Sequence, residues 1–186
     1  LAAAGGHTDI VEMLVGKGAD TKATDGDGIT ALMVAASAGR ADTIRYLLAH
    51  GANANQANQD GSTALTAAAY GGYADAAQEL VTHGANADAL DGIGRTPLMA
   101  AALNGSAAVV KLLIASKASL EIADRSGATA LTYAAAGGQM PVGDLLLGAG
   151  TQKGAEGGMV LAARSCGTTI MKRLMTSGVN VNATYN

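Results

Sequence analysis

The amino-acid sequence predicts an all-α solenoid, in which helix-turn-helix units stack side by side and are joined by β-hairpin loops. Two observations predict this fold class. Several columns of residues recur every 33 positions, and the composition is dominated by Ala and Gly and contains neither Phe nor Trp. A fixed period of roughly 20 to 50 residues is the signature of a repeat architecture. A core rich in Ala also needs backbones that lie close together, which stacked short helices provide.

The repeat is visible in five columns of the sequence. Leu, Thr and Gly each recur at a step of 33, as do a pair of Ala and a pair of large apolar residues. The columns are Leu32, Leu65, Leu98 and Leu131; Thr30, Thr63, Thr96 and Thr129; Gly28, Gly61, Gly94 and Gly127; Ala35/Ala36 to Ala134/Ala135; and Leu47/Leu48 to Leu146/Leu147. Five columns in register are not a chance pattern.

Each unit is expected to fold as a tight turn followed by two short helices. Gly28 supplies the positive φ of a tight hairpin connection, and Thr30 is placed to cap the first helix. This helix contains the Leu and the Ala pair, and a recurring Gly ends it. The second helix carries Ile44, Leu47 and Leu48, an apolar stripe that needs a neighbour to cover it. No unit can bury both helices alone, so the units are expected to stack.

We expect a single domain over residues 1–186. Its units lie at about 25–57, 58–90, 91–123 and 124–151, with a partial unit at 1–24 and a last unit at 152–186 whose hairpin is shortened by five residues. Solenoids end in terminal repeats with a polar outer face, and neither end of this sequence has one. The sequence is therefore expected to be a segment of a longer array.

The pattern Asp-x-x-Gly-x-Thr-x-Leu, followed by Ala-Ala-x-x-Gly, an apolar pair and Gly-Ala-Asn, resembles the ankyrin repeat family over essentially the whole chain. The segment 91–98, Asp-Gly-Ile-Gly-Arg-Thr-Pro-Leu, is the closest match. One position departs from the family, because its usual His is replaced by Met33, Thr66, Met99 and Thr132. The resemblance implies partner binding by the hairpin tips and inner helices, and the loss of the His implies repeats that depend more on packing.

Charge and cysteine content argue against several classes of function. The formal net charge is −3 and no run of Lys or Arg occurs, so nucleic acid is not an expected partner. No stretch of about 18 apolar residues is present, so membrane insertion is not expected either. Cys166 is the single cysteine, which gives no sign of an oxidising compartment and leaves the cytoplasm as the default location.

No catalytic centre, cofactor site or metal site is predicted. The Gly-x-Gly segments 26–28 and 92–94 belong to hairpin turns and follow no buried strand, unlike a dinucleotide-binding loop. His50 and His83 hold equivalent positions, and helices stacked roughly 8 to 10 Å apart would not bring them to one zinc ion. A triad assembled from distant parts of the chain stays open at this stage. The chain is therefore not expected to be an enzyme.

The expected function is to bind a protein or peptide partner. Residues at the hairpin tips and at the ends of the first helices differ between units, whereas the core columns do not. We expect a groove centred on residues 58–128, acidic at one end and basic at the other, that accepts an extended peptide or a helix. The residues predicted to bind are Asp27, Ile29, Gln59, Asp60, Tyr70, Ile93, Arg95, Leu103, Asn104 and Arg125.

Drift at unconstrained surface positions would produce the same variation, and two other roles stay open. One is an architectural subunit that self-associates, or packs in a larger assembly through its ends and outer helices. In that role the Ala-rich segment 75–80 would permit close lateral contact. The other is the targeting arm of an enzyme or channel encoded outside this segment.

Overall fold

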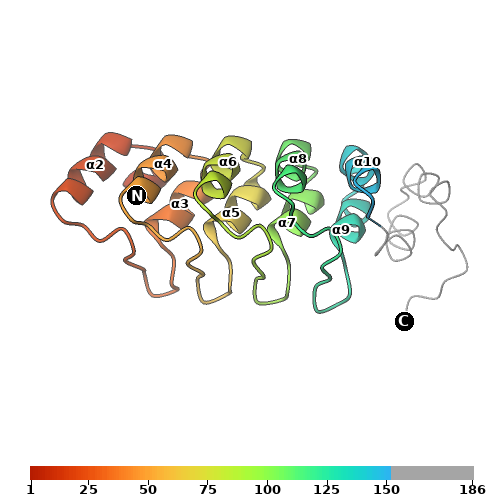
Figure 1. Cartoon of the computed structure of the whole chain (residues 1–186). Helices are drawn as coiled ribbons and strands as arrows, with labels where there is room; N and C mark the ends of the chain where they lie inside the picture. The colour runs from red at the N-terminus through yellow and green to blue at the C-terminus, as the bar shows by residue number, and fades with distance from the viewer. Residues whose placement is uncertain (152–186) are drawn as a thin grey trace, which may run out of the picture.

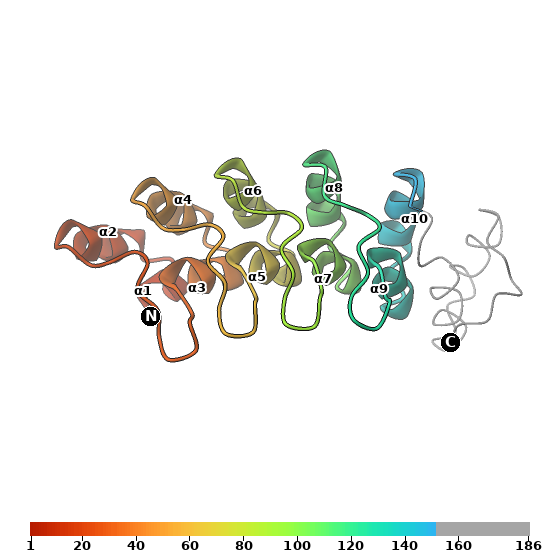
Figure 2. The same ribbon diagram turned by 60° about the horizontal axis from the view of Figure 1, so that its bottom comes forward.

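The helices form two rows in the computed structural model, which describes residues 1–151 (Figure 1). Successive helix pairs advance along one axis, and the loops between pairs project beyond the inner row (Figure 2). The inner row consists of α1 (Ala2–Gly5), α3 (Ala31–Ser37), α5 (Ala64–Gly71), α7 (Pro97–Leu103) and α9 (Ala130–Ala136). The outer row consists of α2 (Thr8–Gly16), α4 (Ala41–Ala49), α6 (Ala74–Thr82), α8 (Ala107–Ala115) and α10 (Met140–Gly148).

This arrangement confirms the predicted all-α solenoid. The projecting loops follow the course of a hairpin, but in the described residues their β-pairing is limited to isolated antiparallel bridges, Thr24 with Thr30 and Ala57 with Thr63. We call the loops 24–30, 57–63, 90–96 and 123–129 the first to fourth fingers. The expected unit at 152–186, with its shortened hairpin and Cys166, lies outside the described residues.

Burial follows the columns seen in the sequence. Leu32, Leu65, Leu98 and Leu131 are each at most 1% exposed and hold equivalent places in successive inner helices. Inner helices contact their neighbours in the row and the outer helix of their own pair. The Ala pairs are buried as well, so the backbones of neighbouring inner helices approach closely.

The first helix pair shows that neighbouring units supply this burial. Leu14 of α2 holds the place of Leu47 in α4 and Leu80 in α6. Leu47 and Leu80 belong to outer helices with a neighbour on each side and are almost fully buried, whereas Leu14 is 49% exposed. Full burial of a Leu side chain contributes about 1.5–3 kcal/mol. A large share of the stability of each unit therefore comes from the units beside it.

Threonine begins the inner helices α3, α5, α7 and α9, as predicted. Oγ1 of the first three cap residues accepts a hydrogen bond from the N–H three positions later, at 3.2–3.3 Å. In α9 the cap is reciprocal, because Thr129 and Thr132 form a capping box. Thr66 and Thr132 replace the His of the family pattern, and both bond to the cap residue of their helix. These bonds stay within one unit, so they do not replace a polar link between neighbouring units, and Met33 and Met99 at the same place are buried apolar residues.

Lys117 follows the C-cap of α8 and has a conformation that the other units give to Gly. Its φ is 62°, and no other non-Gly residue of the described chain has a positive φ. The equivalent Gly residues, with φ between 82° and 93°, are Gly18, Gly51, Gly84 and Gly150. A Cβ at those Gly would meet no atom within 4 Å, so the cost of Lys117 lies in its backbone and not in a clash. A left-handed residue with a Cβ costs about 1–2 kcal/mol.

We expect Lys117→Gly to stabilise the chain by up to about 1 kcal/mol, because the backbone strain disappears while the greater freedom of Gly in the unfolded chain offsets part of the gain. Denaturant unfolding measures the change. Lys117→Ala is the matched control, since it removes the charge but keeps the Cβ. Equal stabilisation by both variants would show that the charge is responsible and would contradict the explanation from strain.

Candidate functional site

One Asp or Asn side chain shapes each finger. In the third finger, Asp91 Oδ1 accepts hydrogen bonds from the N–H of Ile93 at 3.0 Å and of Arg95 at 2.8 Å. The first and fourth fingers have the same pair of bonds, and the second finger has the bond to the residue four positions on. The residues that accept these bonds are Asp25, Asn58 and Asp124. Their step of 33 is visible in the sequence, where Asp and Asn indicate a turn without showing which donors they bind.

Backbone hydrogen bonds join each finger to the next. A tip N–H donates to a carbonyl oxygen of the finger before it, in the pairs Gln59 to Asp27 at 3.0 Å, Gly92 to Asp60 at 2.6 Å and Arg125 to Ile93 at 3.1 Å. Gly61 makes one such approach possible, because its φ is 74° and a Cβ there would lie 3.1 Å from the backbone of residues 91–92. The four fingers therefore form one edge whose tips keep fixed relative positions.

Two adjoining pockets lie between this edge and the inner helices. One has a volume of about 220 Å³, and the side chains at its N-terminal end are Ile29, Met33 and Val34. The other has a volume of about 270 Å³ and is lined at its C-terminal end by Tyr70, Arg95 and Ala100. The residues that line both pockets are Ser37, Ser62 and Ala67. We call the two pockets together the finger–helix groove.

The groove brings together three of the ten predicted binding residues, Ile29, Tyr70 and Arg95. Five others lie at the finger tips outside its lining: Asp27, Gln59, Asp60, Ile93 and Arg125. Leu103 and Asn104 lie at the end of α7 and do not line it either, although Asn104 Nδ2 donates to the backbone oxygen of Tyr70. The sequence did not indicate Met33, Val34 and Ala67, because small and apolar side chains at helical spacing are normally assigned to a core.

Tyr133 is a large side chain one unit beyond the lining of the groove. In α9 this residue holds the place of Val34, Ala67 and Ala100 in the earlier inner helices. Its hydroxyl donates to Asp124 Oδ2 at 2.7 Å, which fixes the half-buried ring. The ring is larger than the side chains at the same place in the earlier units, and neither of the two pockets is lined by a residue beyond Ala100. The groove therefore lies about one unit nearer the N-terminus than the predicted centre on residues 58–128.

Arg95 enters the groove as one half of an ion pair. Its Nε lies 2.8 Å from Oδ2 of Asp91, whose side chain is 4% exposed. Burial acts to raise the pKa of Asp91, but the hydrogen bonds from Arg95 and from the Ile93 N–H outweigh it, and the pKa is lowered. Arg95 belongs to the end of the groove that is predicted to be basic, and Asp91 partly neutralises its positive charge. Arg125 is exposed at the next finger tip.

The contact between Tyr133 and Asp124 persists over a wide range of pH. Burial and the hydrogen bond to Asp124 raise the pKa of Tyr133 to about 12. Burial acts to raise the pKa of Asp124 as well, but the hydrogen bonds from Ser126, Tyr133 and the Ala128 N–H outweigh it and lower the pKa. At neutral pH the phenol is thus a donor and the carboxylate an acceptor.

A model of the family described as ankyrin repeats, in three copies, matches residues 1–91 and 72–157. The chain belongs to the ankyrin repeat family. Ankyrin repeats generally mediate protein–protein interaction and are typically non-catalytic. A search of curated proteins finds no match to this chain.

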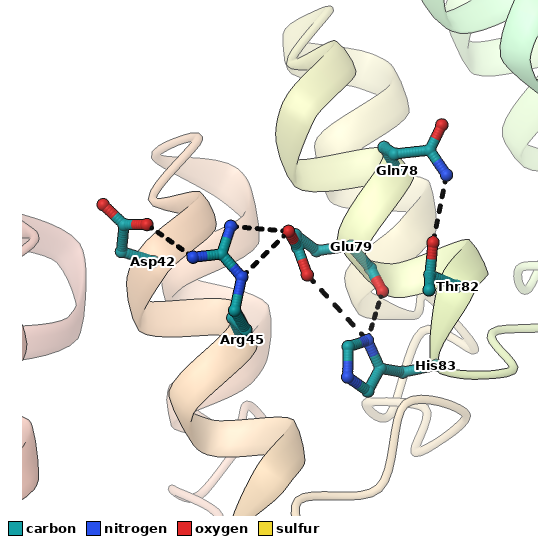
Figure 3. Close-up of polar contacts among 6 residues, drawn as sticks. All are labelled: Asp42, Arg45, Gln78, Glu79, Thr82 and His83. Carbon is teal, nitrogen blue, oxygen red and sulfur yellow. Dashed lines mark hydrogen bonds and ion pairs between the residues drawn. The ribbon is translucent and has the colours of Figure 1, made fainter.

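The outer face of the ankyrin stack carries a polar network between α4 and α6 (Figure 3). Arg45 donates to Asp42 at 2.9 Å within its own helix and, through Nε and Nη2, to one oxygen of Glu79 at 3.0 and 2.6 Å.

The expected lateral contact through the Ala-rich segment 75–80 is wrong, because Ala76 and Ala77 are fully buried inside the stack. They face the neighbouring ankyrin units and not the solvent.

The two equivalent His are the C-cap residues of α4 and α6, and each makes the same local contact. Nδ1 of His50 lies 2.8 Å from the carbonyl oxygen of Tyr46, and Nδ1 of His83 lies 2.8 Å from that of Glu79. In residues 1–151 no group of three or more His, Cys, Asp or Glu could hold a metal ion.

None of the helices in the described part of this ankyrin chain is both long enough and apolar enough to cross a membrane.

Asp91→Ala is expected to destabilise the ankyrin stack by about 1–3 kcal/mol at neutral pH, because two N–H groups and Arg95 lose their acceptor. Asp91→Asn is the matched control and should cost less, because Asn58 shapes the second finger with the same kind of oxygen. Denaturant unfolding at neutral and at acidic pH measures the stability of wild type and of both variants.

The cost of Asp91→Asn should depend on pH in a defined direction. The pKa of Asp91 lies below its ordinary value of 3.8 in the folded chain, so its charged form stabilises the fold above that value. This contribution is lost as the pH falls through the folded pKa. The stability difference between wild type and Asp91→Asn should therefore shrink in acid, and a difference that stays constant would contradict the role of the Asp91 charge.

Proposed function

We propose that the chain is a non-catalytic scaffold that binds a protein or peptide partner in the finger–helix groove. The observation that carries the proposal is that most of the groove is lined by columns whose residues change from unit to unit, whereas the columns that hold the stack together repeat. These variable columns include Ile29, Ser62 and Arg95; Val34, Ala67 and Ala100; and Ser37 and Tyr70, while Thr63 lines the groove from a repeating column. Each unit thus offers a partner a different surface on the same backbone.

Tyr70 is the expected anchor of the interface. Its side chain is 58% exposed, and its hydroxyl has no hydrogen-bond partner within residues 1–151. Tyr and Arg are among the residues that carry most of the binding energy in protein interfaces, especially near the centre of the contact. Tyr70 and Arg95 line the same pocket, which supports this end of the groove as a main area of contact with the partner.

The fixed shape of the fingers supports binding as well. Side-chain hydrogen bonds hold each finger, and backbone hydrogen bonds link neighbouring tips. A surface that is already ordered loses little conformational entropy when a partner binds. The carboxylates of Asp27 and Asp60 are exposed at the first two tips, which favours a partner that brings positive charge to that end.

Self-association, or packing in a larger assembly, stays a prediction from the sequence, and light scattering that shows no growth with concentration would argue against self-association. The role as a targeting arm of a larger enzyme or channel, and the cytoplasmic location, stay predictions from the sequence.

The double variant Tyr70→Ala/Arg95→Ala tests the binding function. The measurement is affinity capture from an extract of cells that express the chain, quantified by mass spectrometry. Wild type should recover a partner, and the variant should recover roughly tenfold less of it, or still less. A tenfold loss of affinity corresponds to about 1.4 kcal/mol. Gln78→Ala/Thr82→Ala is the matched control, because it removes an exposed polar contact from the outer face. Equal recovery by all three proteins would place the binding surface outside the groove.

A further inference from the structure

Resting on the proposed binding function, we propose that the finger–helix groove selects an extended peptide with two features. One is an apolar side chain that enters the pocket beside Val34. The other is a carboxylate, roughly four to six residues away, that binds the guanidinium of Arg95. The chemistry of the two ends of the groove differs, and this difference defines the peptide.

The N-terminal pocket suits a single apolar side chain. Ile29, Met33 and Val34 form its apolar wall, and its volume of about 220 Å³ would hold several water molecules at roughly 30 Å³ each. Water against such a wall is displaced favourably by an apolar group. Asp27 and Asp60 at the adjacent finger tips carry exposed carboxylates, which would repel an acidic side chain from this end.

The C-terminal pocket offers Arg95 as a fixed donor. The Nε atom is bound to Asp91, whereas Nη1 and Nη2 have no partner among the residues that the structure describes. These two nitrogens can donate to both oxygens of one carboxylate. Both oxygens of Asp91 already accept hydrogen bonds and its side chain is almost fully buried, so this carboxylate holds Arg95 without competing for its free nitrogens.

The repeat fixes the distance between the two features. The apolar pocket lies against the first two fingers, and Arg95 belongs to the third, so one and a half to two units separate them. Stacked helices are roughly 8–10 Å apart, and an extended chain advances about 3.3 Å per residue, which gives roughly four to six residues. An extended chain also places single side chains into successive small pockets, as this groove requires.

Tyr133 provides a design for closing the groove without disturbing the fold. Ala67 holds the same place in α5 as Tyr133 in α9, and Asn58 holds the place of Asp124, the partner of the Tyr133 hydroxyl. The Ala67→Tyr variant should therefore fold, and its ring should occupy the space next to the residues that line both pockets. Circular dichroism verifies that the variant is folded, and Gln78→Ala on the outer face is the control that leaves the groove open.

The probe is a phage-displayed library of random peptides of about twelve residues, long enough to span the groove when extended. Selection on the full chain should enrich peptides with an aliphatic residue and an Asp or Glu at a constant spacing. The most enriched sequence, made as a labelled peptide, should bind wild type and Gln78→Ala equally, and should bind Ala67→Tyr at least about tenfold more weakly.

A double-mutant cycle then tests the carboxylate. Replacing the acidic residue of the peptide by its amide should weaken binding to wild type about tenfold and leave binding to Arg95→Gln nearly unchanged. An equal effect on both proteins, or enrichment of peptides without an acidic residue or in helical spacing, would overturn the inference while the groove remains a binding site. Selected peptides that bind Ala67→Tyr as well as wild type would overturn the proposed function itself.

Discussion

The structure depends on the burial of one set of Leu and Ala columns between neighbouring units. Leu32, Leu65, Leu98 and Leu131 lie as equivalent residues along the inner row, and the Ala pairs beside them let the backbones approach closely. No helix in residues 1–151 is longer than nine residues, and helices of that length are marginal in water without tertiary contacts. The contact between units therefore forms the helices and also sets the spacing at which the fingers and the groove repeat.

The groove arises from this spacing combined with a few side chains that break the repeat. The small Ala67 lines the groove, whereas the same place in α9 holds the larger Tyr133, whose hydroxyl donates to Asp124. The ion pair between Arg95 and Asp91 positions a cation at the C-terminal end. The shape of the groove can thus change through single surface positions while the stack stays intact, which is how one fold can carry different sites.

The fold could be predicted from the sequence because every unit carries the residues that stacking requires. The period of 33, the Thr caps and the Ala pairs each describe a local requirement, and all of them agree. The groove could be predicted only in part. Tyr70 and Arg95 were recognised by residue type, but Val34 and Ala67 look like core residues, and the pairing of Arg95 with Asp91 depends on the turn of the finger. The pockets themselves depend on the sizes of neighbouring side chains from different units, which the repeat pattern does not specify.

The central claim is that each unit folds only against its neighbours. Far-UV circular dichroism of the isolated segment 58–90, compared with segment 1–151, tests this claim most directly. The account predicts that 58–90 alone has little helix and no cooperative thermal transition, whereas 1–151 is helical and melts cooperatively. Substantial helix content together with cooperative melting of segment 58–90 alone would contradict the account.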